Sequence, residues 1–290
     1  MELVWLEDFI ALAESGSFIR AAEARHVTQP AFSRRIRSLE HWVGTPLFIR
    51  TPQGTSLTEA GKFILDDAQD TISRLYRLRE DALQASGTVI KHLEIAATHS
   101  LSFTFFPRWI RQLDRKAPIE AIRLHSDSMP RCEGMLSHSH VQFLLSHRHI
   151  HVPPRLPADA YISKRIGEDS LIPLVASNVN LAVDLSELPY LAYSEESGLG
   201  RFVAHQFADK ADYTKLKPLF RSHLAAVLMS MALEGKGIAW LPRSLTEQEM
   251  SSGHLVRALD ESWDIPLEIH LTRPTAVISS FAENFWRQLG

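Results

Sequence analysis

One face of a predicted helix near the start of the chain carries a first set of residues that could do chemistry. Residues 28–43 read TQPAFSRRIRSLEHWV, and Phe32, Ile36 and Leu39 recur at helical spacing, so that their face would pack inward. The opposite face offers amide, hydroxyl and guanidinium groups, which base edges in the major groove and flanking phosphates can bind. The residues on or beside this face are Gln29, Pro30, Ser33, Arg34 and Arg37, and Arg35 lies at its boundary.

The surroundings of this helix favour DNA binding over an ordinary solvated surface. A charged face balanced by Glu40 is common on isolated helices. Here, however, a short helix capped by Ser17 and a turn at His26–Val27 come before it, and Gly44 ends it. The residues at 45–57 include Pro46, Pro52 and Gly54 among β-formers, which predicts a small hairpin, or wing. Arg50 would stand on this wing, within reach of a phosphate or the minor groove.

A long helix is predicted from Thr58 to about Ala85. Its apolar residues form a narrow stripe: Ile64, Ala68, Ile72, Leu75, Leu78 and Ala82. Such a seam favours pairing with a second helix, which would place two reading heads on a two-fold DNA site. Packing on the chain's own domain is the alternative.

Composition is that of a globular protein with local rather than overall positive charge. The chain has 290 residues, 45% apolar content and a net charge of −3, so any DNA contact must come from a local cluster. We see no secretory signal and no apolar run long enough to cross a membrane, and we expect a cytoplasmic protein. A single cysteine, Cys132, excludes an internal disulfide. No motif of an enzyme is present, and no cofactor is expected.

Beyond a hinge at residues 86–88 the pattern alternates between strands and helices. Strands are predicted at 92–98, 121–125, 141–146, 171–176, 188–193, 238–241 and 267–271, and helices at 103–113, 200–210, 224–233 and 279–289. This alternation predicts α/β layers with parallel pairing.

A strand-to-helix junction at residues 98–102 is the best candidate for a ligand site. Exposed N–H groups and hydroxyls at a helix N-terminus favour an anion or a carboxylate, although a serine there can also simply cap the helix. We take Ser100, Leu101 and Ser102 as candidates. Residues near further predicted strand ends join them, and these are Ser128, His147, Tyr193, Arg201 and His223.

A run of histidines could bind a transition metal, but we do not predict a metal site. His138, His140, His147, His149 and His151 fall within residues 137–151. On an extended segment alternate imidazoles would point to one side and could hold zinc, copper or nickel. No carboxylate lies inside the run and no second cysteine exists, which favours a titrating polar surface or loop.

The N-terminal pattern resembles the signature of the LysR-type transcriptional regulators. It reads AA…VTQPAFSRRIRSLE…VGTPLFIR…LTEAG, covers residues 1 to about 65 densely, and the order of elements fits that family over the whole length. Two residues depart from the family pattern. Arg25 replaces the usual leucine and could point outward or pair with Glu23 or a phosphate. Gln53 replaces a frequent second wing arginine, which implies one fewer backbone contact.

The resemblance implies a complete architecture and a function. The N-terminal winged helix-turn-helix (mainly α, residues 1–58) would be followed by a long linker helix for dimerisation (59–86) and an α/β effector domain (87–290). The latter would comprise two Rossmann-like subdomains of periplasmic-binding-protein type, subdomain I over about 91–162 and 266–290 and subdomain II over about 163–265. A homodimer or homotetramer would bind promoter DNA, controlled by a small-molecule effector, with an anion preferred, in the cleft between subdomains.

Two segments suggest a particular branch of this family. AATHSLSFTFFP at 96–107 and GIAWLP at 237–242, together with Arg25, resemble the branch that contains the hypochlorite-responsive regulator. Methionine oxidation can bias a two-state domain. The alternative function is therefore a metal- or oxidant-responsive regulator that uses the histidine run or the methionines Met129, Met135, Met229, Met231 and Met250, although core packing is the simpler role for most of them.

Overall fold

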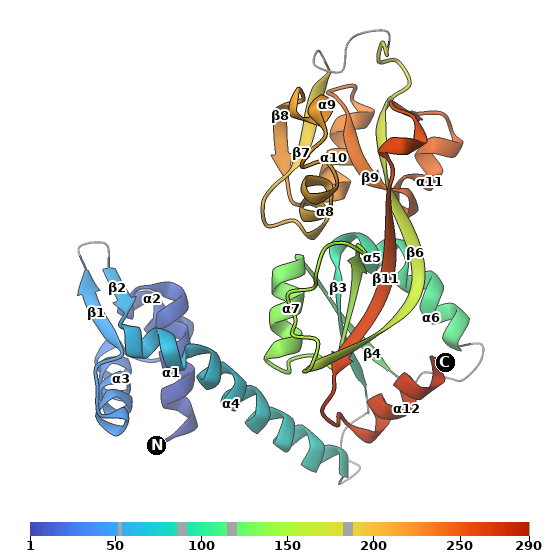
Figure 1. Ribbon diagram of the computed structural model, residues 1–290. Helices are drawn as coiled ribbons and strands as arrows, with labels where there is room; N and C mark the ends of the chain where they lie inside the picture. Colours follow the sequence, from blue (N-terminus) through green and yellow to red (C-terminus); the bar gives the residue numbers. More distant parts are fainter. Residues whose placement is uncertain (52–53, 86–91, 115–120, 182–187, 290) are drawn as a thin grey trace. The chain divides into compact units, whose positions relative to one another are not determined.

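The protein forms two compact units, residues 1–89 and 90–290. The structure, a computed structural model, describes residues 1–51, 54–85, 92–114, 121–181 and 188–289 (Figure 1). Among these residues no helix is long and apolar enough to cross a lipid bilayer.

The N-terminal unit is a small helical domain with a two-stranded wing. Phe9, Phe32 and Leu39 are fully buried in its core, and Leu47 joins them from the segment before the wing. The predicted helices and hairpin are confirmed. The elements are α1 (Leu3–Ser15), α2 (Phe18–Ala24), α3 (Gln29–Val43), β1 (Phe48–Thr51), β2 (Gly54–Leu57) and α4 (Glu59–Ala85).

Glycines end two of these helices, and the second of them, Gly44, is predicted to do so from the sequence. Gly16 and Gly44 adopt left-handed backbone conformations, with φ of 63° and 88°, and each donates its N–H to a carbonyl of the preceding turn. The predicted caps at the helix starts behave differently. Ser17 and Thr28 occupy the N-cap positions, but neither side chain accepts a hydrogen bond from the helix. Thr58 does cap α4, because its Oγ1 accepts the N–H of Gly61 at 3.0 Å.

A buried carboxylate holds the first three helices together and explains Arg25. Asp8 of α1 is fully buried, and its Oδ1 accepts a hydrogen bond of 2.9 Å from Arg25 Nε. Arg35 of α3 reaches the other oxygen of Asp8 at 3.4 Å, and Arg25 also bonds to Glu7. The expectation that Arg25 points outward or pairs with Glu23 or a phosphate was wrong, because α1 supplies two carboxylates that a sequence pattern does not place beside it.

Replacing Arg25 with the leucine usual in this pattern should therefore destabilise the N-terminal unit. The change leaves Asp8 buried with Arg35 as its remaining charged partner, and we expect a loss of about 1–3 kcal/mol in the free energy of unfolding. Urea denaturation of the single variant Arg25→Leu and of the double variant Arg25→Leu/Asp8→Leu measures this. The double variant should recover part of the loss, and equal stability of the two would contradict the pairing.

The long helix α4 has two different halves. Ile64, Ala68 and Ile72 of its stripe pack against the core of its own unit. Further along, Leu75 and Leu78 of the same stripe are exposed, with Leu78 67% accessible. Packing on the chain's own domain therefore accounts for the first half of the stripe only, and the second half leaves apolar side chains uncovered.

The C-terminal unit is built on one mixed sheet with strand order β10-β6-β11-β5-β3-β4. β3 pairs in parallel with β4 and β5, whereas β11 is antiparallel to both β5 and β6. β9 adds to β6, and β7 and β8 form a separate parallel pair. The strands are β3 (Leu93–Thr98), β4 (Ile122–Asp127), β5 (Phe143–Arg148), β6 (Tyr161–Ala176), β7 (Pro189–Tyr193), β8 (Lys217–Ser222), β9 (Ala239–Pro242), β10 (Leu255–Arg257) and β11 (Ile265–Pro274).

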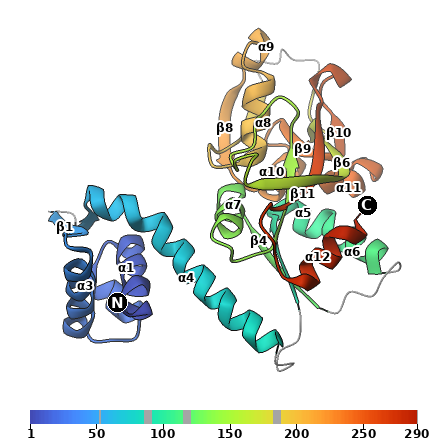
Figure 2. The same cartoon turned by 60° about the horizontal axis from the view of Figure 1, so that its bottom comes forward.

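Helices cover both faces of the sheet in subdomain I. Ile95 and Ala97 point to one face, where Trp109 and Phe285 of α6 and α12 pack. Ala96 points to the other face and contacts α7. Figures 1 and 2 show α7 on one side and α6 and α12 on the other. The helices are α5 (His99–Thr104), α6 (Phe106–Asp114), α7 (Met129–Ser137), α8 (Gly198–Gln206), α9 (Ala211–Thr214), α10 (Ala225–Leu233), α11 (Arg243–Ser251) and α12 (Ser280–Gln288), with a 3₁₀ turn at Glu261–Trp263.

Subdomain II has its own core and is joined to subdomain I through two long strands. Trp240 is fully buried among aromatic rings, and its Nε1 donates to the carbonyl of Trp263 at 3.0 Å. β6 and β11 pair along ten residues, from Ile265 opposite Leu171 to Pro274 opposite Tyr161. The connections between subdomains thus lie within continuous strands.

Two predictions about these elements were incomplete. The strand predicted at 171–176 is only the last part of β6, since its first part is polar and half-exposed and carries little apolar signal. The single helix predicted at 103–113 is two helices, which meet at Phe105. In addition α7, α9, α11, β8 and β10 were missed.

Candidate functional site

The polar face of α3 presents the side chains that the sequence singles out. Gln29, Pro30, Arg34 and Arg37 are exposed, and Ser33 is half-buried between them. Gln29 Nε2 donates to Ser33 Oγ at 3.0 Å. Arg37 Nε donates to the Ser33 carbonyl at 3.3 Å. These contacts lie along the helix and leave the outer ends of the guanidinium groups facing solvent.

The structure places the two predicted wing residues, Arg50 and Gln53, only in part. Arg50 belongs to β1, where it pairs with Thr55, but its side chain lies outside the described atoms. Gln53 lies outside the described residues. Arg35, at the boundary of the predicted reading face, is turned toward Asp8 and does not belong to that face.

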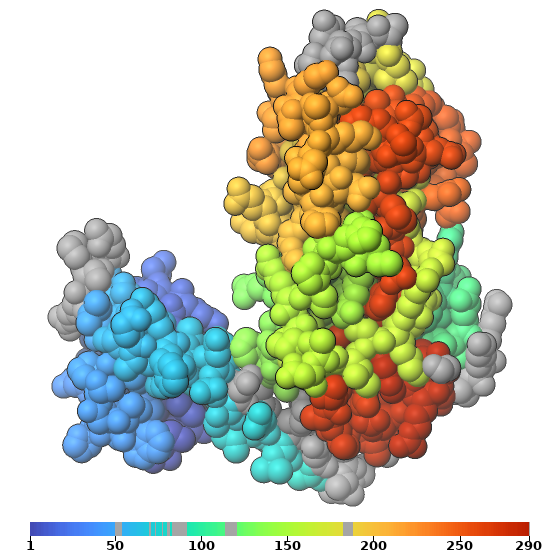
Figure 3. All heavy atoms as spheres, viewed as in Figure 1, coloured from blue at the N-terminus to red at the C-terminus, as the bar shows by residue number. Residues whose placement is uncertain are grey.

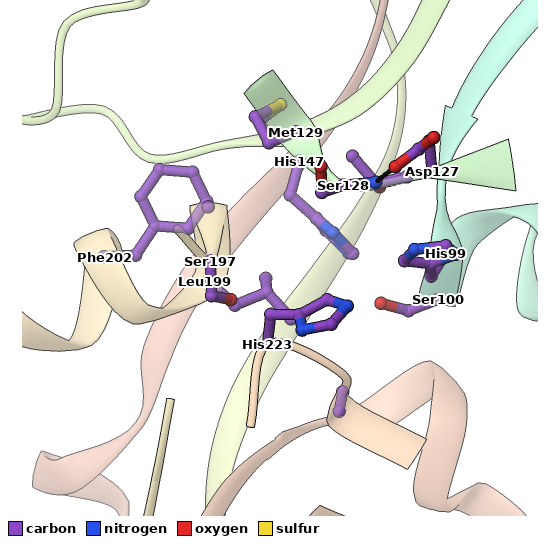
Figure 4. Close-up of a pocket in the computed structure, with 13 residues that line it drawn as sticks. His99, Ser100, Asp127, Ser128, Met129, His147, Ser197, Leu199, Phe202 and His223 are labelled. Carbon is purple, nitrogen blue, oxygen red and sulfur yellow. Dashed lines mark hydrogen bonds between the residues drawn. The ribbon is translucent and has the colours of Figure 1, made fainter. Parts of the chain in front are cut away.

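A cavity lies between the two subdomains of the C-terminal unit. It has an empty volume of about 440 Å³ that opens to solvent. Figure 4 shows His99 and Ser100 on one side and Ser197, Leu199 and Phe202 on the other, with His147 and His223 between them. Its lining comprises Thr98, His99, Ser100, Asp127, Ser128, Met129, His147, Ser197, Gly198, Leu199, Phe202, His223 and Ala225.

The subdomains contact each other beside this cavity. Figure 3 shows atoms of α7 (green) directly beneath atoms near residue 200 (orange). Gly198 begins α8, and a Cβ added there would lie 3.1 Å from Met129 Cβ. The first residues of α7 and α8 therefore pack closely, and a side chain at Gly198 would require Met129 to shift.

Several helices begin at the cavity wall. The N-terminal residues of α7, α8 and α10, namely Met129, Gly198 and Ala225, all line it. Helix N-termini carry unpaired N–H groups and a partial positive charge, which favour anions. The rings of His99 and His223 lie 6.1 Å apart across the cavity. Thr98 Oγ1 is buried without a hydrogen-bond partner among the described atoms.

One carboxylate also lines the cavity, but it is already engaged. Asp127 Oδ1 accepts a hydrogen bond of 2.6 Å from the backbone N–H of Ser128, at the start of α7 (Figure 4). Because α5 also begins at the cavity, with His99, the lining combines one bonded carboxylate with three histidines and four helix starts. This arrangement suits a small anion.

The structure brings four of the eight predicted ligand residues together. Ser100, Ser128, His147 and His223 line the cavity.

The other four do not line it. Leu101 is fully buried in the core of subdomain I, because it faces the sheet. Ser102 Oγ bonds to the His99 carbonyl at 2.7 Å and to Ser126 Oγ at 2.8 Å. Tyr193 and Arg201 line a separate groove within subdomain II. Arg201 lies on α8 between Leu199 and Phe202, but those two side chains line the cavity and Arg201 does not.

Sequence reasoning missed much of the cavity lining. His99 and Asp127 follow or end parallel strands at the same sheet edge as Thr98, which was a usable signal. Ser197, which caps α8 by accepting the N–H of Gly200 at 3.3 Å, could have been found as a helix start. Phe202 and Leu199 gave no signal distinct from core packing.

Beneath the cavity, a buried hydrogen-bond network joins both subdomains. His147 of β5 and Asp169 of β6 are each only 2% exposed, and His147 Nε2 lies 3.0 Å from Asp169 Oδ2. Ser244 of α11 donates to the same carboxylate through its hydroxyl at 2.6 Å and its N–H at 3.1 Å. Ser244 Oγ also lies 3.2 Å from Thr104 Oγ1 in subdomain I. A cavity residue is thereby tied to the strand that connects the subdomains.

Comparison with known proteins identifies the family of the chain. Residues 3–62 match the model of the bacterial regulatory helix-turn-helix protein, lysR family. Residues 86–290 match the LysR substrate binding domain. The chain belongs to the LysR family of transcriptional regulators. Its α3 is the second helix of the helix-turn-helix, and its interdomain cavity lies in the substrate binding domain.

Individual relatives of this LysR-family chain are regulators over their full length. The HTH-type transcriptional regulator YjiE of Escherichia coli is 32% identical, across 100% of this chain and 94% of its own. Full-length HypT of Salmonella typhimurium, a hypochlorite-specific LysR-type regulator, is 30% identical with a TM-score of 0.60, across 100% and 97%. Vibrio fischeri DarR in complex with DNA is 29% identical with a TM-score of 0.58, across 100% and 98%.

These comparisons fix the family and leave the branch as a suggestion. HypT and DarR are similar to this chain at nearly the same identity, so the level of similarity does not separate them. The families and relatives found are transcriptional regulators and not enzymes. In keeping with this, burial raises the pKa of the Cys132 thiol to about 12, which keeps it protonated and unreactive at neutral pH.

The histidine run of this LysR-family chain is not one extended segment. His138 follows the end of α7, His147 lies within β5, and His149 and His151 follow that strand. His149 is buried beside His205 of α8, with ring centroids 6.0 Å apart. Within the described residues no group of three or more His, Cys, Asp or Glu side chains is arranged to hold a metal ion.

Burial keeps part of this run neutral. Burial, and then the neighbouring His151 and His205, lower the pKa of His149 below its ordinary value of 6.5. His149 is therefore uncharged at pH 7.

The Asp169 network predicts how stability depends on pH. Burial alone would raise the pKa of Asp169, but hydrogen bonds from His147, Ser244 and the Ser170 amide outweigh it, so that the pKa is lower than its ordinary value of 3.8. Because the folded state holds the proton more weakly than the unfolded state, Asp169 stabilises the fold above about pH 4, and this contribution is lost as the pH falls through its folded pKa. Denaturation between pH 7 and pH 3 should show a steeper acid loss for the native chain than for Asp169→Asn. Identical pH profiles would contradict this role.

Proposed function

We propose that this regulator binds promoter DNA through the exposed face of α3 and that a small anion in the interdomain cavity controls the binding. The observation that carries the effector half is the convergence of four helix starts and three histidines on one cavity between the subdomains. The DNA half rests on the position of Gln29, Ser33, Arg34 and Arg37 on the solvent face of the helix-turn-helix, with Pro30 in its first turn and Arg50 on the wing. We place the protein in the cytoplasm, where bacterial promoters are accessible.

We infer that the chain acts as a homodimer that can assemble into a homotetramer. The uncovered apolar side chains of α4, Leu75 and Leu78, support pairing of this helix with a second copy. A two-fold dimer would present two α3 helices to successive major grooves on one side of the DNA. The solved complex of DarR with DNA supports promoter binding by a protein of this architecture.

The proposed effector is a small anion rather than a large or cationic molecule. The cavity volume of about 440 Å³ includes the space at its mouth, so the bound molecule must be small. The N–H groups of the His99 and His223 imidazoles and the helix N-termini would each favour negative charge. The regulatory domain of HypT, 26% identical with a TM-score of 0.57, has been solved with a bromide ion bound, which supports anion binding in a related domain.

Control would follow from a change in the relation of the two subdomains. An anion that contacts Ser100 in subdomain I and Ser197 in subdomain II binds best when the two walls are at one particular separation. The strands β6 and β11 connect the subdomains and would absorb the movement. The anion shifts DNA binding only as far as it binds one arrangement better than the other.

Anion binding to the full chain tests this proposal. Bromide, sulfate and acetate are titrated by calorimetry at constant ionic strength, with a bulky buffer anion as the background. We expect saturable binding of one of them, and loss of that binding in Ser128→Phe, because the ring would occupy the cavity. Ser251→Phe, at an exposed site on α11, is the matched control and should bind as the native chain does. Absence of binding by all three anions, or unchanged binding by Ser128→Phe, would refute the anion site.

A further inference from the structure

A second, larger hollow lies wholly within subdomain II. It is formed by β7, α8, α9 and β8, which lie together in the upper middle of Figure 1. Its empty volume is about 1150 Å³, open to solvent. We call it the subdomain II groove. Small residues on α8 and just after it, Ala204 and Ala208, leave room for a ligand along that side.

The inner wall of the groove is aromatic. Tyr190 and Phe207 are buried, and Tyr213 is half-buried. The rings of Phe207 and Tyr213 lie 5.2 Å apart, and the hydroxyls of Tyr190 and Tyr213 are 3.0 Å apart. These hydroxyls bond to each other, so neither is a free polar group in the wall. Tyr213 presents ring surface to the groove, and Tyr190 and Phe207 support it from the core. Such a wall favours stacking with a flat, apolar ligand.

Two guanidinium groups line the same groove. Arg221 ends β8 and is exposed, and Arg201 lies on α8. Within the described residues neither forms an ion pair with a carboxylate, and Arg201 donates to the Pro153 carbonyl at 3.3 Å. Burial raises the pKa values of Tyr190 and Tyr213, and the positive charge of Arg221 acts in the opposite direction. Arg221 is therefore close to the aromatic wall. Glu195 is the one carboxylate in the lining, and it is exposed.

We propose that the subdomain II groove is a second ligand site, distinct from the interdomain cavity, for a small aromatic carboxylate. The ring would lie against Tyr213, which Tyr190 and Phe207 support from the core, and the carboxylate would accept hydrogen bonds from Arg221 and Arg201. Guanidinium groups bind carboxylates bidentately. Because the lining holds two arginines and one glutamate, its charge is positive and favours an anionic ligand. The apolar wall excludes small inorganic ions as good ligands, which separates this site from the interdomain cavity.

The two sites share α8 as a common wall. Leu199 and Phe202 face the interdomain cavity, whereas Gly200 and Ala204 face the groove. Arg201 lines the groove and also a small hollow beside Pro153. A ligand carboxylate that accepts a hydrogen bond from Arg201 would compete for this guanidinium with the Pro153 carbonyl, which lies in the segment between β5 and β6. Occupation of the groove should therefore alter the position of α8 and, through it, the affinity of the interdomain cavity.

Binding of naphthalene-2-carboxylate to the full chain, without DNA, tests this site. We expect saturable binding with one site per chain by calorimetry. Naphthalene-2-carboxamide, which has the same shape without the charge, should bind the native chain at least about tenfold more weakly than the carboxylate does. Naphthalene-2-carboxylate should bind Arg221→Gln more weakly by a similar factor, because each change removes a charge-assisted contact. Arg111→Gln removes an exposed arginine of α6 outside the groove and should leave the affinity unchanged.

Two further variants locate the ligand. Ala204→Trp places a large side chain in the groove from an exposed helix position and should abolish binding. Ser128→Phe fills the interdomain cavity and should leave naphthalene-2-carboxylate bound, so that failure of the anion site and failure of the groove site are distinguishable. Absence of saturable binding, equal affinity for the carboxamide, equal effects of Arg221→Gln and Arg111→Gln, or loss of binding in Ser128→Phe would each overturn the proposal.

Discussion

Replacing Arg34 and Arg37 together by alanine should weaken operator binding by about a hundredfold or more. Both side chains are exposed on the outer face of α3, and each can contact a base edge or a phosphate. Loss of one such contact costs about 1–3 kcal/mol, and the two losses act on the same interface. The fold should be unaffected, because neither side chain belongs to the core of the N-terminal unit.

An operator selected from random DNA by the native chain provides the substrate for this measurement. Binding isotherms at several salt concentrations should show weaker affinity and a shallower salt dependence for Arg34→Ala/Arg37→Ala, since phosphate contacts release counterions. Arg108→Ala/Arg111→Ala removes the same charge from exposed positions of α6 and serves as the control. If the two double variants bound alike, the exposed face of α3 would not be the reading face.

Replacing Asp169 by alanine should lower the free energy of unfolding of the C-terminal unit by about 3–5 kcal/mol. The change leaves His147 Nε2, the Ser244 hydroxyl and the Ser244 and Ser170 amides without the carboxylate that they now share. Buried donors that lose their acceptor retain the full cost of desolvation. This is the largest single-residue effect on stability that we expect in the C-terminal unit.

Denaturant unfolding followed by tryptophan fluorescence measures the effect. Trp240 and Trp263 are buried in the core of subdomain II and report on its unfolding. Asp209→Ala removes an exposed aspartate of the same subdomain and should change stability little. If Asp169→Ala and Asp209→Ala had the same free energy of unfolding, the hydrogen bonds around Asp169 would not stabilise the C-terminal unit.

Local spacing accounts for what the sequence predicted well in the N-terminal unit. Gly16 and Gly44 end helices because only glycine adopts their left-handed conformation readily, and the spacing of Phe32, Ile36 and Leu39 fixes which face of α3 is exposed. The partner of Arg25 was not predictable in this way. It depends on α1 packing across α2, which brings Asp8 to a residue 17 positions later in the chain.

In the C-terminal unit the elements were easier to predict than the site. Strand ends at Thr98 and Asp127 are adjacent because β3 and β4 are parallel neighbours, so part of the cavity follows from topology. Tyr193 and Arg201 could not be assigned correctly from strand order alone. Their direction depends on the rotation of α8 against β7, where Gly200 lies so close that an added Cβ would be 2.7 Å from Tyr193 Cβ.

The linkage between the cavity and DNA is the central claim, and operator affinity measured with and without a bound anion tests it most directly. The anion that binds best in calorimetry is added at constant ionic strength to the native chain and to Ser128→Phe. We predict that the anion changes the operator affinity of the native chain by the same factor by which the operator changes the anion affinity, and that Ser128→Phe shows no such change. An anion that binds the cavity of the native chain yet leaves operator affinity unaltered would contradict the account.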